Sequence, residues 1–90
     1  MQKHNVLLEK RACKQLEKLS EDVCNRIMEA LYTLREEGFS GRLNIKKLQG
    51  LRDQYRLRIG RYGALFELRP GRTIVAYAVL PRKAAHWDKS

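Results

Sequence analysis

Cysteine, histidine and long apolar runs are scarce in this chain of 90 residues. Its two cysteines, Cys13 and Cys24, lack the Cys-x-x-Cys spacing of metal sites, and its two histidines, His4 and His86, are too far apart in sequence to form a recognisable ligand set. No apolar run approaches the ~20 residues of a membrane-spanning helix, and the amino terminus has no secretory pattern. We therefore expect a cytoplasmic protein without metal or cofactor. Its cysteines should be buried thiols, and a disulfide between two neighbouring helices is the alternative.

The sequence also lacks any stretch rich in proline, glycine and serine that would mark a linker or a disordered tail. With 43% hydrophobic residues, it has enough apolar material for a core. A chain of 90 residues is nevertheless too short for two independent modules. We therefore expect one domain that spans residues 1–90.

Acidic residues are in deficit, with ten Asp and Glu against nineteen Lys and Arg and a formal net charge of +9. The excess is uneven, because residues 51–90 hold nine Lys and Arg but three Asp and Glu, whereas residues 1–50 hold ten and seven. A field of this sign attracts nucleic acid, an acidic protein or an anionic membrane surface. Charge alone does not choose among them, although the membrane is the weakest of the three.

Helical spacing of apolar residues is confined to the first half of the chain. A short apolar run at 5–9 indicates a strand, and Ala12 and Leu16 then lie on one face of an amphipathic helix. Ser20, followed by two acidic residues, has the features of an N-cap, and Gly38 is a stop signal. Between them, one helix face carries the apolar residues Val23, Ile27, Ala30, Leu31 and Leu34.

The segment 55–59 carries the most informative pattern of the chain. It alternates apolar residues with Arg56 and Arg58 at the two-residue period of a strand, so that one face of this strand belongs to the core and the other is a row of guanidiniums. Cations held rigidly at strand spacing suit a polyanion better than they suit solubility.

The remaining segments complete a topology. A turn at 60–63 followed by an apolar run at 64–68 predicts a hairpin, residues 73–80 predict a further strand, and 39–47 is interpreted as a connection. The resulting fold class is α+β, a twisted antiparallel sheet of about four strands with an N-terminal helical hairpin packed on one face. The element order is strand, helix, helix, strand, strand, strand, and the second face of the sheet is left for a ligand.

With these residues in place, the chain resembles the RelE/ParE superfamily, the toxin half of toxin-antitoxin pairs, and most of all its RelE and HigB branches. The family pattern is Lys-Leu-x-Gly, then Tyr-Arg-Ile/Leu-Arg-x-Gly, an Asp-Tyr-Arg turn and a late arginine followed by an aromatic residue. The matching segments are 47–50, 55–60, Tyr62, 81–82 and 86–87. The resemblance therefore covers essentially the whole chain.

Similarity to RelE implies a ribosome-dependent endoribonuclease that cuts messenger RNA without metal, by attack of the ribose 2′-OH on the adjacent phosphate. Fixed guanidiniums stabilise the charge that develops on the phosphoryl oxygens. The resemblance implies four catalytic residues: Arg56, Arg58, Arg82 and His86. It further suggests an RNA-binding set: Lys46, Lys47, Arg61, Tyr62 and Lys83.

Two departures from the family pattern concern the site. The turn arginine of the family falls at Gly63, with Arg61 two residues earlier, so that this cation has either moved within the turn or been lost. The carboxy-terminal acid or base, commonly tyrosine, falls at His86, and a histidine with an unperturbed pKa near ~6.5 can protonate a leaving 5′ oxygen. Glu67 is a candidate base, but strand parity from sequence does not say which face it takes.

The partners implied by the resemblance are messenger RNA, the ribosome and a cognate antitoxin with which the toxin forms a hetero-oligomer. Such an antitoxin would need an acidic or amphipathic segment to cover the basic face. Two other functions stay open at this point: a ParE-like inhibitor of DNA gyrase, and a catalytically degenerate RNA-binding member, which Gly63 favours.

Overall fold

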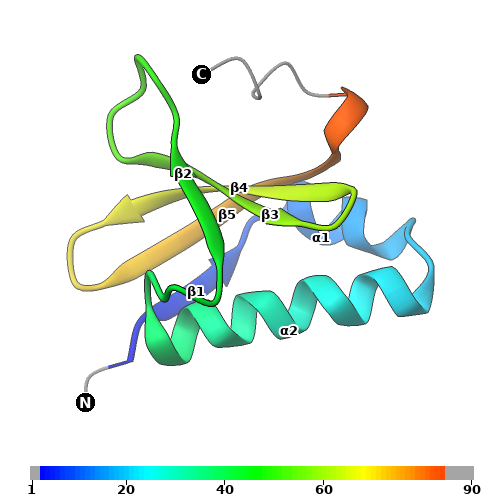
Figure 1. Cartoon of the computed structure of the whole chain (residues 1–90), viewed down its shortest axis with the longest axis horizontal. Coiled ribbons are helices and arrows are strands. Elements are labelled where there is room, and N and C mark those ends of the chain that lie inside the picture. Colours follow the sequence, from blue (N-terminus) through cyan, green and yellow to red (C-terminus); the bar gives the residue numbers. More distant parts are fainter. Residues whose placement is uncertain (1–2, 85–90) are drawn as a thin grey trace.

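The computed structural model describes residues 3–84, which form a five-stranded sheet with both α-helices on one side (Figure 1). The elements in chain order are β1 (Asn5–Leu8), α1 (Lys10–Glu17), α2 (Glu21–Glu37), β2 (Asn44–Lys47), β3 (Gln54–Ile59), β4 (Tyr62–Arg69), β5 (Thr73–Pro81) and the short 3-10 helix η1 (Arg82–Ala84). The α+β class is therefore confirmed. The β2–β3 loop and η1 both lie on the side of the sheet away from α2, and between them one face of the sheet carries no helix.

The strand order is β1-β5-β4-β3-β2, and this corrects the expected sheet in two ways. The segment 39–47 is not only a connection, because its second half forms edge strand β2 against β3. In addition, β1 pairs with β5 in parallel, whereas all the other pairs are antiparallel. After α2 the chain enters the sheet at the far edge, and successive antiparallel strands return it to the side of β1.

Local sequence signals place the ends of α2. The Ser20 side chain accepts a hydrogen bond from the Val23 N–H at 3.3 Å, which satisfies one of the free donors of the first turn. At the other end Gly38 has a φ of +70°, and its N–H donates to the Leu34 carbonyl at 2.9 Å. Both predicted helix boundaries are confirmed.

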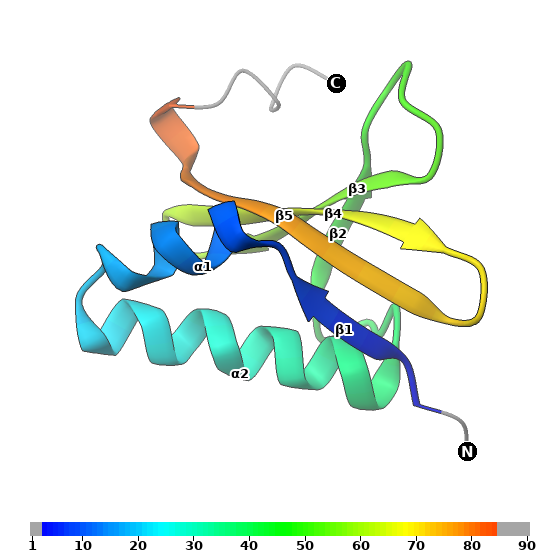
Figure 2. The same ribbon diagram turned by 180° about the vertical axis from the view of Figure 1, so that it is seen from behind.

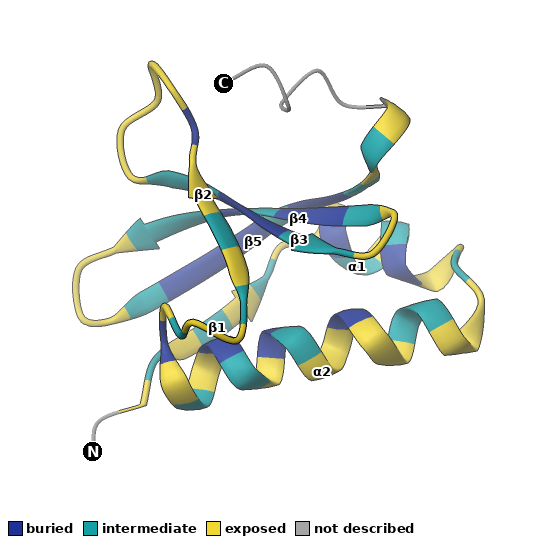
Figure 3. Ribbon diagram, in the orientation of Figure 1, coloured by how far each residue is buried: buried dark blue, intermediate teal, exposed yellow. Residues whose placement is uncertain are grey.

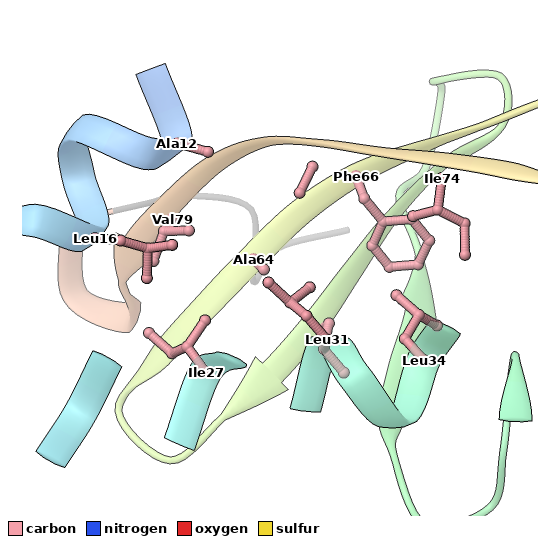
Figure 4. Packing of buried hydrophobic residues seen from close by; sticks show 11 residues of the cluster. Ala12, Leu16, Ile27, Leu31, Leu34, Ala64, Phe66, Ile74 and Val79 are labelled. Atoms are coloured by element: carbon pink, nitrogen blue, oxygen red, sulfur yellow. The ribbon is translucent and has the colours of Figure 1, made fainter. Parts of the chain in front are cut away.

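The core lies between the helices and the covered face of the sheet (Figure 4). Leu31 and Leu34 of α2 point toward Phe66 of β4, which is fully buried. The Tyr55 ring stacks on Phe66 with a centroid separation of 5.5 Å, and Phe39 meets Tyr55 edge to face at 4.9 Å. These aromatic contacts join the start of β3 to β4 and to the segment that follows α2.

Seen from behind, α1 lies between β5 and the start of α2 (Figure 2). Cys13 and Cys24 are free thiols, and each is half-buried rather than fully buried. Within residues 3–84, no helix combines the length and the apolar character needed to cross a membrane.

Gly38 is predicted to tolerate no side chain. A Cβ built there would lie 2.9 Å from Cε1 of His4, and the positive φ is itself unfavourable for an L-residue. We expect Gly38→Ala to lower the free energy of unfolding by about 1–3 kcal/mol. Urea denaturation measures this, and Gly41→Ala is the matched control because nothing lies within 4 Å of its Cβ position. Equal stabilities of the two variants would contradict the assignment.

His4 predicts a loss of stability in mild acid. Burial, and then the Arg72 charge, lower the pKa of His4 below its usual 6.5, so that the folded state favours the neutral ring. The unfolded chain then binds the proton first, and stability falls as the pH drops below 6.5. The free energy of unfolding is measured by urea denaturation at pH 7 and pH 5, on either side of the unperturbed histidine pKa of about 6.5. We expect His4→Gln to lose less stability between these two pH values than the wild type does. An equal loss in the two proteins would exclude His4 as its source.

Candidate functional site

One face of the sheet carries neither α-helix and lies on the side away from α2 (Figure 1). Leu57 pairs with Ile45 and Ala64 and belongs to the core, so its side chain points toward the helices. Because successive side chains of a strand point to opposite faces, Arg56 and Arg58 point the other way. We name this surface the guanidinium face and define it by Lys46, Arg56 and Arg58.

The two arginines of β3 differ in burial. Arg56 is only 5% exposed, whereas Arg58 is half-buried. The middle of β3 is buried and its two ends are half-buried (Figure 3). A charged side chain with so little contact with solvent is not part of an ordinary solvated surface, because burying a guanidinium is costly unless it is compensated.

Cross-strand pairing places further residues beside these arginines. Lys46 of β2 is directly opposite Arg56, and Asn44 is directly opposite Arg58. Directly opposite residues in an antiparallel pair share a face. Asn44 was missed in the sequence because 39–47 was interpreted as a connection. The alternation of Leu43 and Ile45 with Asn44 and Lys46 is the signal that would have revealed it.

The end of the β3–β4 hairpin brings two distant arginines together. Ile59 pairs with Tyr62, so the turn consists of Gly60 and Arg61, and Gly60 has the positive φ of +58° that a type II′ turn needs at its first central position. Beyond the last pair of β4 and β5, the Arg82 N–H donates to the Arg61 carbonyl at 2.8 Å. The strand ladder therefore continues as far as Arg82.

A hollow of about 700 Å³ lies at this end of the sheet. Its lining residues are Arg61, Tyr62, Pro81, Arg82 and Lys83. Four of the five belong to the sequence-predicted site, although they come from segments about twenty residues apart. The structure thus groups the turn cation with the late arginine.

Not every predicted residue shares the guanidinium face. Lys47 pairs with Tyr55, and Tyr62 pairs with Ile59, so both have the parity of the helix-covered face. Tyr62 packs partly against the core and also lines the hollow. His86 lies outside the described residues.

The strand registers give the place of the two positions that the sequence left open. Gly63 pairs with Arg58, so an arginine at position 63 would stand directly beside Arg58, whereas Arg61 lies in the turn. Glu67 pairs with Gln54 and therefore has the parity of Arg56, on the helix-free face. Its carboxylate accepts a hydrogen bond from Nε of Arg69 at 2.8 Å.

Tyr77 lies in β5 close to this carboxylate. The register between β4 and β5 shifts after Leu65, leaving Tyr77 as the extra residue of a β-bulge. Burial, and then the negative charge of Glu67, raise the pKa of Tyr77 above its usual 10.0. The phenol is protonated at neutral pH with or without this shift, so its hydroxyl can donate a hydrogen bond.

Gln15 of α1 secures the strand that leads to Arg82. Its Oε1 accepts a hydrogen bond from the Val79 N–H at 2.6 Å, just after the bulge. No motif in the sequence marks this contact, because the two residues are 64 positions apart.

The donor chemistry of the guanidinium face suits an anion. Arginine presents planar N–H groups that match phosphate oxygens, and the backbone of a sheet holds them with little freedom. Among residues 3–84, His, Cys, Asp and Glu form no cluster of three or more that could hold a metal ion.

No protein-family model matches the sequence, and no curated protein matches it either. Solved structures do match in fold. The RelE of the archaeal RelE-RelB complex from Pyrococcus horikoshii has a TM-score of 0.79 and 25% identity, over 92% of this chain and 99% of that one. The RelB-RelE antitoxin-toxin complex from Methanococcus jannaschii gives a TM-score of 0.76 and 30% identity, over 87% and 92%. A mutant of the E. coli toxin RelE in the free state gives 0.75 at 18% identity, over 97% and 92%.

The five-stranded sheet with both helices on one face is the fold that this chain shares with these RelE structures. The likeness extends over nearly the full length of both chains and reaches 30% identity. This chain therefore belongs to the RelE toxin superfamily.

Gln15 yields a prediction on stability. Gln15→Ala leaves the Val79 N–H without the Gln15 oxygen and should cost about 1–3 kcal/mol in the free energy of unfolding, measured by urea denaturation. Gln15→Glu retains an acceptor oxygen at the same place and should keep most of the stability. If the two variants were equally destabilised, the hydrogen bond would not be the cause.

Proposed function

We propose that this protein is the toxin of a toxin-antitoxin pair and cleaves messenger RNA on the ribosome in the cytoplasm. The single observation that carries the proposal is the guanidinium face, in which β3 holds Arg56 and Arg58 on the side of the sheet that no helix covers. Membership in the RelE toxin superfamily supports the same conclusion.

The proposed reaction is an internal phosphoryl transfer that needs no metal. The ribose 2′ oxygen loses its proton and bonds to the adjacent phosphorus, while the bond from phosphorus to the 5′ oxygen breaks and that oxygen takes up a proton. The products are a 2′,3′-cyclic phosphate and a free 5′-OH. Negative charge grows on the non-bridging oxygens at the transition state, where fixed guanidiniums contribute most.

We assign the residues by their place in this reaction. Arg56 and Arg58 contact the phosphate, with the buried Arg56 as the more rigid of the two. Arg82 approaches from the end of β5. His86 is proposed as the acid that protonates the 5′ oxygen. Glu67 is a weaker candidate base than sequence alone suggested, because Arg69 already holds its carboxylate.

The exposed cations around this centre are proposed to give affinity rather than chemistry. These are Lys46, Lys47, Arg61 and Lys83. Each phosphate that they neutralise releases counterions, so binding should weaken steeply with salt. Tyr62 is proposed to contact RNA from within the hollow, because its strand register is that of the helix-covered face and it packs partly against the core.

An antitoxin is the expected protein partner. The matching structures from Pyrococcus horikoshii and Methanococcus jannaschii are complexes of RelE with RelB. In this chain the guanidinium face would attract an acidic antitoxin segment, which would block RNA at the same time.

Cleavage on the ribosome tests the function. We expect Arg58→Ala and Arg82→Ala each to slow the cutting of messenger RNA on programmed ribosomes by about a hundredfold, as losing one charge-stabilising donor does in other enzymes. Cut sites are mapped by primer extension. Lys14→Ala is the matched control, because it removes one positive charge from an exposed position on α1. This variant should cut messenger RNA at the wild-type rate.

Three outcomes would contradict the proposal in different ways. Cleavage that survives both arginine substitutions would remove the mechanism. Binding of RNA without any cleavage by the wild type would indicate a degenerate member. Intact message together with inhibited DNA gyrase supercoiling would favour the ParE-like function.

A further inference from the structure

The guanidinium face consists of side chains that can only donate hydrogen bonds, because lysine and arginine have no acceptor atom. Lys46, Arg56 and Arg58 can therefore bind the phosphate oxygens of RNA and of DNA alike. The group that distinguishes the two polymers is the ribose 2′-OH, which donates as well as accepts a hydrogen bond. An acceptor beside the phosphate-binding arginines would detect the hydroxyl hydrogen, which DNA lacks.

On strands β2 to β4, three side chains with acceptor oxygens have the register of this face: Asn44, Gln54 and Glu67. Asn44 pairs directly with Arg58, which places the two Cβ atoms about 4.5–5.5 Å apart. Gln54 is four residues from Arg58 along β3, or about 13 Å at strand spacing, and Glu67 pairs with Gln54. The Glu67 carboxylate is moreover held by Arg69. Of the three acceptors, Asn44 is therefore the nearest to Arg58.

Asn44 is the first residue of edge strand β2, most of which is exposed (Figure 3). Leu43 and Ile45 on either side of it pack against the core, so the Asn44 side chain points to the guanidinium face. Asparagine is disfavoured in strands. The preceding turn uses Ser40 instead, whose Oγ accepts a hydrogen bond from the Arg42 N–H at 3.1 Å. The local fold thus does not call for an asparagine at this place.

A neutral acceptor suits this position better than a carboxylate would. A carboxylate opposite Arg58 would form an ion pair with it and compete with phosphate for the guanidinium. The Asn44 amide accepts a hydrogen bond through Oδ1 and leaves the positive charge of Arg58 and Lys46 available to phosphate. The ribose is a better ligand for this short side chain than a base, because the 2′-OH belongs to the sugar-phosphate backbone that Arg58 binds, whereas the base extends away from it.

We propose that Asn44 recognises the ribose 2′-OH of an RNA whose phosphate is bound by Arg58, with the hydroxyl donating a hydrogen bond to Oδ1. This inference rests on the proposed function, because it assumes that the guanidinium face binds RNA. It adds a means of selecting ribose over deoxyribose. The hydroxyl next to this phosphate is also the nucleophile of the proposed reaction, so the same hydrogen bond holds it beside the phosphorus.

Binding is measured by fluorescence anisotropy in low salt, where phosphate contacts are strongest, with labelled single strands of one sequence made as RNA, 2′-fluoro RNA and DNA. The 2′-fluoro strand keeps the sugar pucker of RNA but has no hydroxyl hydrogen. We expect the wild type to bind RNA about fivefold more tightly than either analogue, as one hydrogen bond allows. Asn44→Ala should bind all of these strands with the affinity that the wild type has for DNA.

Two further variants separate the acceptor from other effects. Asn44→Asp keeps an acceptor oxygen and should keep the preference for RNA, while its negative charge beside Arg58 weakens the binding of every strand. Asn25→Ala is the matched control, because it removes an exposed asparagine from α2 in the helical layer. This control should have the affinities of the wild type.

The outcomes separate this inference from the proposed function, because cleavage of messenger RNA on the ribosome is measured independently. The role of Asn44 would be overturned if the wild type bound no strand or showed no preference for RNA, if Asn44→Ala kept the preference, or if Asn44→Asp lost it as well. A defect of Asn44→Ala confined to strands that contain adenine would assign the amide to a base edge and overturn it too. The expected pattern in a wild type that does not cut messenger RNA would overturn the proposed cleavage and leave the role of Asn44 intact.

Discussion

The pleat of β3 is the constraint on which the rest of this structure depends. Leu57 is fully buried against the helices, so the residues on either side of it must point to the opposite face. A shift of one residue in register would bury Arg56 and Arg58 in the apolar core and expose Leu57. The burial of Leu57, which stabilises the fold, therefore also determines on which face of the sheet the guanidiniums lie.

The position of Arg82 depends on longer-range constraints. Three features of β5 determine it: the bulge at Tyr77, the hydrogen bond that the Val79 N–H donates to Gln15, and the backbone hydrogen bond that the Arg82 N–H donates to Arg61. Each of these orients the end of β5 relative to the β3–β4 hairpin. The hollow between them is a consequence of strand pairing, not of any local motif.

Charge is unevenly distributed over the two layers. In the helical layer α1 is rich in lysine and arginine and α2 in glutamate, whereas β3 carries Arg56 and Arg58 on the face of the sheet that no helix covers. The two-layer architecture gives each layer one solvent-facing side, and these two arginines belong to the side of the sheet.

Much of the fold could be predicted because its signals are local. The apolar face of α2, its cap at Ser20, its end at Gly38 and the alternation in β3 need only neighbouring residues to specify them. Strand β2, Asn44–Lys47, was missed because Ile45 is the one apolar residue among its four, so that its alternation is visible only when the preceding Leu43 is included. The parallel pairing of β1 with β5 was missed because it joins segments about seventy residues apart.

By itself the sequence determined which residues are arginines, how they alternate with core residues and which helices flank them, since these properties are carried along the chain. Only the tertiary structure decided that Arg56 is buried, that Glu67 shares its face, that Tyr62 and Lys47 do not, and that Arg61 lies beside Arg82. The physical reason is that burial and strand register depend on pairing between distant segments, and the free energy of that pairing depends on how the whole core packs.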